Sequence, residues 1–129
     1  MPVSLRRRLL GVALLALVTA LTISPAMAES LHPYRWKNRI IQIATPTLAD
    51  PLYQKQAALL LAAYRDLLER DIIVITDSTA TKFTLTLIGK DGGQKLTRDT
   101  VLAPDELFAI IDAMPMRRQE MRSVPAPAN

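Results

Sequence analysis

A long stretch rich in alanine and leucine, from Pro51 to Arg70, separates two short runs rich in isoleucine. The first run, Arg39 to Ala44, is short and β-branched, which favours a strand. Asp50 followed by Pro51 is a typical helix start, with an N-cap side chain and then a proline at the first helical position. The second run, Ile72 to Ile75, is continuous, as is typical of a central parallel strand buried on both faces. This order predicts a right-handed βαβ unit.

The long stretch also shows one apolar stripe with helical spacing, so we expect one long helix lying across a sheet. The residues of this stripe are Tyr53, Ala57, Leu60, Tyr64 and Leu67.

The remainder of the chain adds two strands and another helix. Apolar residues alternate with threonines from Phe83 to Leu87, which predicts a strand with two different faces. Lys90 to Gly93 then predicts a hairpin turn, and the polar segment Gln94 to Arg98 an edge strand. A helix should run from Pro104 to Pro115. The sum is an α/β protein with a reduced thioredoxin-like fold, in which a four-stranded mixed sheet carries a long helix after the first strand and a C-terminal helix.

The N-terminal segment has the organisation of a secretory signal peptide. Three arginines at positions 6–8 precede an uncharged apolar run, Leu9 to Ile23, and Ala26-Met27-Ala28 is a cleavage signal. The apolar run is shorter than the roughly 20 residues of a membrane-spanning helix, although an uncleaved anchor stays an open alternative. We therefore predict a signal peptide over 1–28, a thioredoxin-like domain over 29–116 and a disordered polar tail over 117–129. The mature chain would be periplasmic or extracellular, without a stable membrane span.

Charge and composition narrow the partners and the chemistry. The chain has 16 basic and 12 acidic residues, and three of the basic residues leave with the signal peptide, so the net charge falls from +4 to about +1. A nucleic-acid partner is therefore not expected. The absence of cysteine excludes thiol–disulfide exchange and thiol peroxidase activity. His32 is the one histidine, so no histidine pair can bind a metal, and neither a metal nor a cofactor is expected. Catalysis through another site stays possible, but the chain favours a non-catalytic protein.

Two surfaces are candidate binding sites. The first is the crevice at the carboxyl ends of the parallel strands, where open α/β sheets usually hold ligands. Its lining would be polar, although ordinary loop composition explains the same residues: Thr45, Thr47, Gln54, Asp77, Thr79 and Thr81.

The second surface surrounds the one tryptophan of the chain and contains Trp36, Lys37 and Arg39. It could stack on a sugar or a base. The interpretation that we favour is that Trp36 closes one end of the core while the cations face water.

Two further charge clusters have simple structural interpretations. Acidic and basic residues alternate near the end of the long helix, which indicates a solvated, salt-bridged helix end; they are Arg65, Asp66, Glu69, Arg70 and Asp71. A weaker cationic cluster near the C-terminus is most simply part of a solvated tail, and it contains Arg117, Arg118 and Arg122.

Several segments together resemble the bacterial domain-of-unknown-function family 4174. The segments are Tyr34-Arg-Trp-Lys-Asn-Arg39, Tyr53-Gln-Lys-Gln56, Glu69-Arg-Asp71, Leu87-Ile-Gly-Lys-Asp-Gly-Gly93 and Ile111-Asp-Ala-Met-Pro-Met-Arg117. The resemblance covers roughly Leu31 to Arg122 and implies a thioredoxin-like fold without established catalytic residues. Related domains in animal extracellular-matrix proteins with sushi repeats or coiled coils imply adhesion or matrix binding. The recurrent family positions are interpreted as structural: Trp36, Arg39, Gln56, Arg70 and Asp71.

Two functional hypotheses follow from these observations. The leading one is an exported, non-catalytic thioredoxin-like module that binds an envelope or extracellular protein or a glycan. The alternative is a cysteine-free enzyme or redox-accessory protein that uses the crevice at the strand ends.

Overall fold

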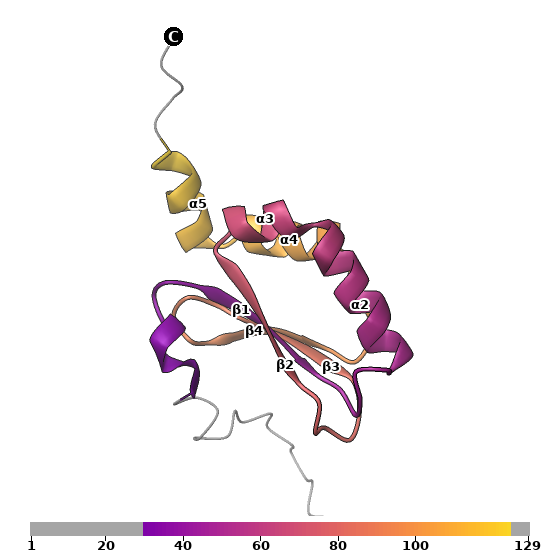
Figure 1. Ribbon diagram of the computed structural model, residues 1–129. Coiled ribbons are helices and arrows are strands. Elements are labelled where there is room, and N and C mark those ends of the chain that lie inside the picture. Colours follow the sequence, from indigo (N-terminus) through magenta and orange to yellow (C-terminus); the bar gives the residue numbers. More distant parts are fainter. Residues whose placement is uncertain (1–29, 125–129) are drawn as a thin grey trace, which may run out of the picture.

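The computed structural model describes residues 30–124, which form a four-stranded mixed sheet with helices packed on one face (Figure 1). The strands are β1 (Arg39–Ala44), β2 (Ile72–Asp77), β3 (Thr84–Ile88) and β4 (Gln94–Arg98), and their order in the sheet is β2-β1-β3-β4. β1 pairs parallel with β2 and antiparallel with β3, which pairs antiparallel with β4. The α/β class and the mixed sheet are confirmed, and the strand order is consistent with a thioredoxin-like fold.

The position of β2 corrects one sequence prediction. β2 lies at the edge of the sheet rather than in its centre, and 42% of Val74 is exposed. Its apolar run reflects two partly covered faces, because Ile72 and Ile73 lie on opposite sides of the strand and each packs against a different cluster. The parallel strand that lies inside the sheet is β1, in which Ile41 and Ile43 are almost completely shielded from solvent.

The predicted long helix is interrupted. α2 (Pro51–Ala62) and α3 (Tyr64–Glu69) are separated by Ala63, which adopts φ −101° and ψ 21°. The predicted start is correct, because the Asp50 side chain accepts hydrogen bonds from the backbone N–H groups of Leu52 and Tyr53. Beyond the break the stripe is only partly buried, with Leu67 in the core and Tyr64 56% exposed.

Two hydrophobic clusters lie on the two faces of the sheet. On the helix-covered face, alternate residues of β1 and β3 pack against the helices; this cluster includes Ile41, Ile43, Leu60, Leu67, Leu85, Leu87, Leu107 and Ile111. On the opposite face, Ile40 and Ile88 pack with Leu31, beside the short 3-10 helix η1 (His32–Tyr34). The period of two along each strand thus distributes neighbouring isoleucines between two cores.

The C-terminal region contains two helices, each of which begins at a proline. α4 (Pro104–Asp112) agrees with the predicted C-terminal helix, and α5 (Pro115–Arg122) follows it. The prediction of a disordered tail is therefore wrong for residues 117–122. Residues 125–129 and the predicted signal peptide, 1–28, lie outside the described residues. Within residues 30–124, no helix is long and apolar enough to cross a membrane.

Candidate functional site

At the carboxyl ends of β1 and β2, where a crevice was predicted, the polar side chains form hydrogen bonds within their own loops. Thr45 is buried, and its hydroxyl donates to the Thr47 carbonyl at 2.9 Å. The Thr47 hydroxyl accepts from the backbone N–H of Ala49 at 2.8 Å, and the Gln54 side chain donates to the Leu48 carbonyl. These three predicted site residues therefore shape the loop that precedes α2.

The loop after β2, which would form the other side of the crevice, also contains hydrogen bonds between its own residues. The Asp77 carboxylate accepts from the Thr79 hydroxyl at 2.6 Å and from the Thr79 backbone N–H at 2.9 Å. Both bonds hold the pKa of Asp77 below its usual value, and the bond from the hydroxyl has the larger effect. The Thr45 N–H donates to the Asp77 carbonyl at 2.8 Å, which joins the two loops, and Thr81 is exposed. The structure thus brings Thr45 close to Asp77 through the backbone.

Trp36 does not close the core, contrary to the interpretation that we favoured. It is 62% exposed and has φ 67°, which is a rare conformation for an aromatic residue. Its backbone N–H donates to the Lys90 carbonyl at 2.6 Å, and the Arg35 guanidinium lies 5.3 Å from the centroid of its ring. The predicted patch is divided, because Lys37 is exposed whereas Arg39 is buried.

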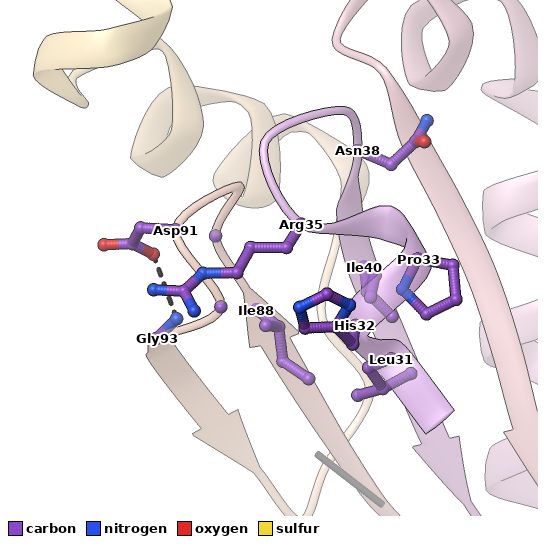
Figure 2. A pocket seen from close by; sticks show the side chains of 11 residues that line it. Leu31, His32, Pro33, Arg35, Asn38, Ile40, Ile88, Asp91 and Gly93 are labelled. Atoms are coloured by element: carbon purple, nitrogen blue, oxygen red, sulfur yellow. Dashed lines mark hydrogen bonds between the residues drawn. The ribbon is translucent and has the colours of Figure 1, made fainter. Parts of the chain in front are cut away.

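Residues 35–37 form a turn that we call the tryptophan turn. A cavity of about 860 Å³ lies beside it, between the segment 31–38 and the glycine-rich turn 89–93 (Figure 2), and Arg35 lines this cavity whereas Trp36 does not. Arg35 extends across the cavity towards Asp91 and Gly93 in Figure 2. Gly92 has φ 83°, which favours glycine, and a Cβ atom there would touch the Arg35 side chain at 3.8 Å. The complete lining is Leu31, His32, Pro33, Arg35, Asn38, Ile40, Ile88, Gly89, Asp91, Gly92 and Gly93. We refer to it below as the turn cavity.

A second cavity, of about 400 Å³, lies between the α2–α3 region and the edge strand β2. Its lining is almost entirely apolar and includes the exposed side chains of Leu61, Tyr64, Leu68 and Val74. The sequence prediction missed both cavities. The turn cavity joins the segments 31–40 and 88–93, which are distant in the chain, and the second cavity depends on the position of β2 at the edge of the sheet, which was predicted wrongly. The one local signal for the turn cavity was the tryptophan next to a basic residue. Its closeness to the glycine-rich turn is visible only in the fold.

The amino ends of β1 and β2 carry a network of buried and half-buried ion pairs. The Arg39 guanidinium donates to both carboxylate oxygens of Glu120 at 3.2 Å, and Lys90 Nζ lies 2.7 Å from Glu120 and 2.8 Å from Asp71. Arg70 contacts Asp112 at 2.8 Å. The network joins β1, the glycine-rich turn, α4 and α5. The predicted solvated, salt-bridged helix end is present, because Arg70 pairs with the exposed carboxylates of Asp66 and Glu69, but Arg70 also reaches Asp112 in α4.

Arg117 belongs to the same network, which corrects its assignment to a solvated tail. Its side chain is 6% exposed and contacts Glu69 at 2.9 Å and Asp112 at 3.1 Å. Burial disfavours the charged guanidinium, but these two carboxylates outweigh that cost and raise the pKa of Arg117. The other two arginines of the predicted cationic cluster, Arg118 and Arg122, are exposed.

Two carboxylates of the network, Asp112 and Glu120, have a lowered pKa. Hydrogen bonds from Arg70, with support from Arg117, hold the pKa of Asp112 below its usual value. Burial of Glu120 raises its pKa, but the hydrogen bonds from Lys90 and Arg39 exceed that effect and leave the pKa lowered. Asp112 and Glu120 are therefore both charged around neutral pH.

One buried polar residue of α2 has a purely structural role. The Gln56 side chain donates to the Leu102 carbonyl at 3.0 Å and accepts from the Leu102 N–H at 2.7 Å. It ties α2 to the segment before α4, a role that fits the structural interpretation of its family position. Gln56 could have been recognised as a polar residue four positions before Leu60, in the buried phase of the helix.

The comparisons identify the family of the chain. Among residues 30–124, no group of three or more histidine and carboxylate side chains is placed to hold a metal ion. A search of curated proteins finds no match. The family model described as "Domain of unknown function (DUF4174)" matches residues 30–80 and 76–120, which include the tryptophan turn, the glycine-rich turn and the ion-pair network. The chain therefore belongs to the DUF4174 family.

Proposed function

We propose that this protein is an exported, non-catalytic binding module of the cell envelope and that the turn cavity binds a saccharide. The observation that carries the proposal is Trp36, because a large apolar side chain is presented to solvent on a backbone held at positive φ. Such a conformation costs about 1–3 kcal/mol, and strained residues of this kind cluster at binding sites. A core residue would offset that conformational cost by packing against its neighbours. Trp36 is exposed, so packing does not offset the cost in the same way.

The chemistry of the turn cavity favours a saccharide over a purely apolar or a highly charged ligand. Leu31, Ile40 and Ile88 supply an apolar surface, whereas Asn38 and Asp91 supply polar groups. A sugar ring has apolar C–H faces and a rim of hydroxyls, so it can use both kinds of contact. A mostly apolar cavity with a few polar groups is typical of small-molecule sites.

Trp36 also provides the test, since it is the one tryptophan in the chain. It does not itself line the turn cavity, but its ring lies 5.3 Å from the guanidinium of Arg35, which does, so a ligand that moves Arg35 should change its fluorescence. We expect emission from the secreted protein to change on titration with soluble N-acetylglucosamine oligomers. We also expect the protein to co-sediment with purified peptidoglycan. Absence of both signals overturns the saccharide assignment, and a protein partner bound instead would replace it.

The matched variant is Trp36→Gly, because glycine adopts φ 67° without strain and the substitution removes the whole side chain. We expect it to keep the fold, to be as stable as the wild type or about 1 kcal/mol more stable, and to lose co-sedimentation. Thr47→Ala, in the predicted crevice, should bind normally. Loss of binding in Thr47→Ala with retention in Trp36→Gly would instead favour a ligand site at the strand ends.

Export is tested separately by the N-terminal sequence of the protein recovered outside the cytoplasm. We expect it to begin at Glu29. A start at Met1 in the membrane fraction would favour a retained anchor.

A further inference from the structure

The tryptophan turn is attached to the C-terminal helix through one residue of the glycine-rich turn. The Lys90 carbonyl accepts the backbone hydrogen bond of Trp36 at 2.6 Å. The Lys90 side chain, which is only 9% exposed, contacts Glu120 of α5 at 2.7 Å and Asp71 at 2.8 Å. Glu120, Lys90 and Trp36 therefore form a continuous connection from α5 to the tryptophan turn.

The attachment of α5 depends on charge rather than on apolar packing. The buried residue of α5 is an arginine, Arg117, whose partners are Glu69 and Asp112. Glu120 supplies the second attachment, through Arg39 and Lys90. The first attachment reaches α3 and α4, whereas the second reaches β1 and the glycine-rich turn, so substitutions at Glu69 and at Lys90 remove different partners. Within α5 the two attachments meet, because Arg117 lies 3.8 Å from Glu120.

We propose that Glu120 and Lys90 are positioning residues for the saccharide site, holding Trp36 in its exposed, left-handed conformation. The geometry supports this role because the same lysine bonds α5 with its side chain and Trp36 with its main chain. Asp71 accepts a hydrogen bond from the same ammonium group and, within residues 30–124, is the other non-glycine residue with positive φ, at 52°. One lysine therefore bonds both turns: its ammonium group donates to Asp71, and its main-chain carbonyl accepts from Trp36. The relevance to ligand binding rests on the proposed function, but the positioning itself does not.

The test is hydrogen exchange of the Trp36 backbone amide, measured on the full secreted chain without ligand. Glu120→Gln removes the negative charge with little change in volume, and Lys90→Met keeps the aliphatic stem without the ammonium group. We expect both variants to accelerate exchange of the Trp36 amide by about tenfold, the effect of losing a charge-assisted hydrogen bond.

Two controls separate positioning from general destabilisation. Glu69→Gln weakens the first attachment of α5 without touching Lys90, and it should leave the exchange rate of the Trp36 amide unchanged. Gln56→Ala removes two buried hydrogen bonds to Leu102 at a distant position and lowers global stability. It should accelerate exchange in the core amides but not selectively at Trp36.

The outcomes are distinct from those of the glycan experiment. Selective acceleration at Trp36 in Glu120→Gln and Lys90→Met supports the positioning role even if no saccharide binds. Unchanged exchange in these variants, or the same acceleration in Gln56→Ala, overturns it. If peptidoglycan binds to the wild type, Glu120→Gln should also bind it more weakly, by about tenfold.

Discussion

The two ends of the sheet use polar residues in opposite ways. At the carboxyl ends of β1 and β2, side-chain hydrogen bonds join residues only two to six positions apart, as in Thr45–Thr47 and Gln54–Leu48. At the amino ends, Arg39 bonds the Arg70 carbonyl, 31 positions away, and Glu120, 81 positions away. The first end therefore stabilises local loops, whereas the second joins distant segments. In this protein the contacts at the amino ends of β1 and β2, and not those at the usual ligand crevice, hold the residues of the candidate site in place.

The largest effect should come from Glu120→Ala at the amino ends. The Arg39 side chain is 2% exposed, and without Glu120 it would lose its carboxylate partner in the network. Leaving such a charge uncompensated is expected to cost about 3 kcal/mol of the free energy of unfolding. Urea unfolding monitored by circular dichroism measures this change.

Glu106→Ala is the matched control for that experiment. Glu106 forms an exposed ion pair with Arg98 at 3.7 Å, so its loss should cost less than about 0.5 kcal/mol. Equal losses in the two variants would show that the buried network adds nothing beyond surface pairing.

A smaller effect should appear in the pH dependence of stability. The folded-state pKa values of Asp112 and Glu120 lie below their ordinary values of 3.8 and 4.5, respectively. Their contribution is therefore fully present above these ordinary values and is lost as the pH falls through the lowered ones. Urea unfolding at a series of pH values down to about pH 3 should show the decline.

Arg70→Met sharpens this prediction, because Arg70 is the main cause of the lowered pKa of Asp112. The variant should be less stable at neutral pH and should lose less stability on acidification than the wild type. An unchanged acid dependence in Arg70→Met would assign the decline to carboxylates outside this network.

At the carboxyl ends, Asp50→Ala should have the next largest effect. It removes the N-cap bonds to Leu52 and Tyr53 at 2.9 and 3.2 Å, and such a loss typically costs about 1 kcal/mol. Asp50→Asn should retain most of this stability, which thermal unfolding of the two variants can compare. A loss as large as that of Glu120→Ala would contradict the contrast between the two ends.

Thr79→Val should have the smallest effect. Its hydroxyl bond to Asp77 is exposed, so the stability should change by less than about 0.5 kcal/mol. The pKa of Asp77 should rise towards its usual value, as measured by NMR titration of the carboxyl carbon. An unchanged pKa would mean that this hydrogen bond does not persist in solution.

Local signals in the sequence predicted most of the fold. Asp50-Pro51 marked the start of α2, the alternation after Phe83 marked β3, and the glycine-rich segment marked the turn before β4. These features depend on backbone preferences within a few residues. The position of β2 could not be predicted in this way, because an edge strand with apolar partners on both faces has the same composition as a central strand.

The candidate site was predicted only in part. Trp36 was identified as a candidate, but its exposure follows from a positive φ that the sequence does not encode in an obvious way. Arg39 and Arg117 were assigned to solvent because cations usually lie there. Arg39 did carry a signal, since it is in phase with Ile41 and Ile43 on the buried face of β1. Its partner, Glu120, lies too far along the chain for any local pattern to indicate the pair.

The distance between Arg39 and Glu120 has a consequence for the order of folding. Their ion pair closes a loop across 81 positions of the chain, so chain entropy opposes its formation until the sheet has already assembled. We therefore expect this contact to be absent from the transition state. Glu120→Ala should then accelerate unfolding and leave the refolding rate nearly unchanged. The attachment of the C-terminal helix α5 would thus slow the unfolding of the domain without affecting how fast it folds.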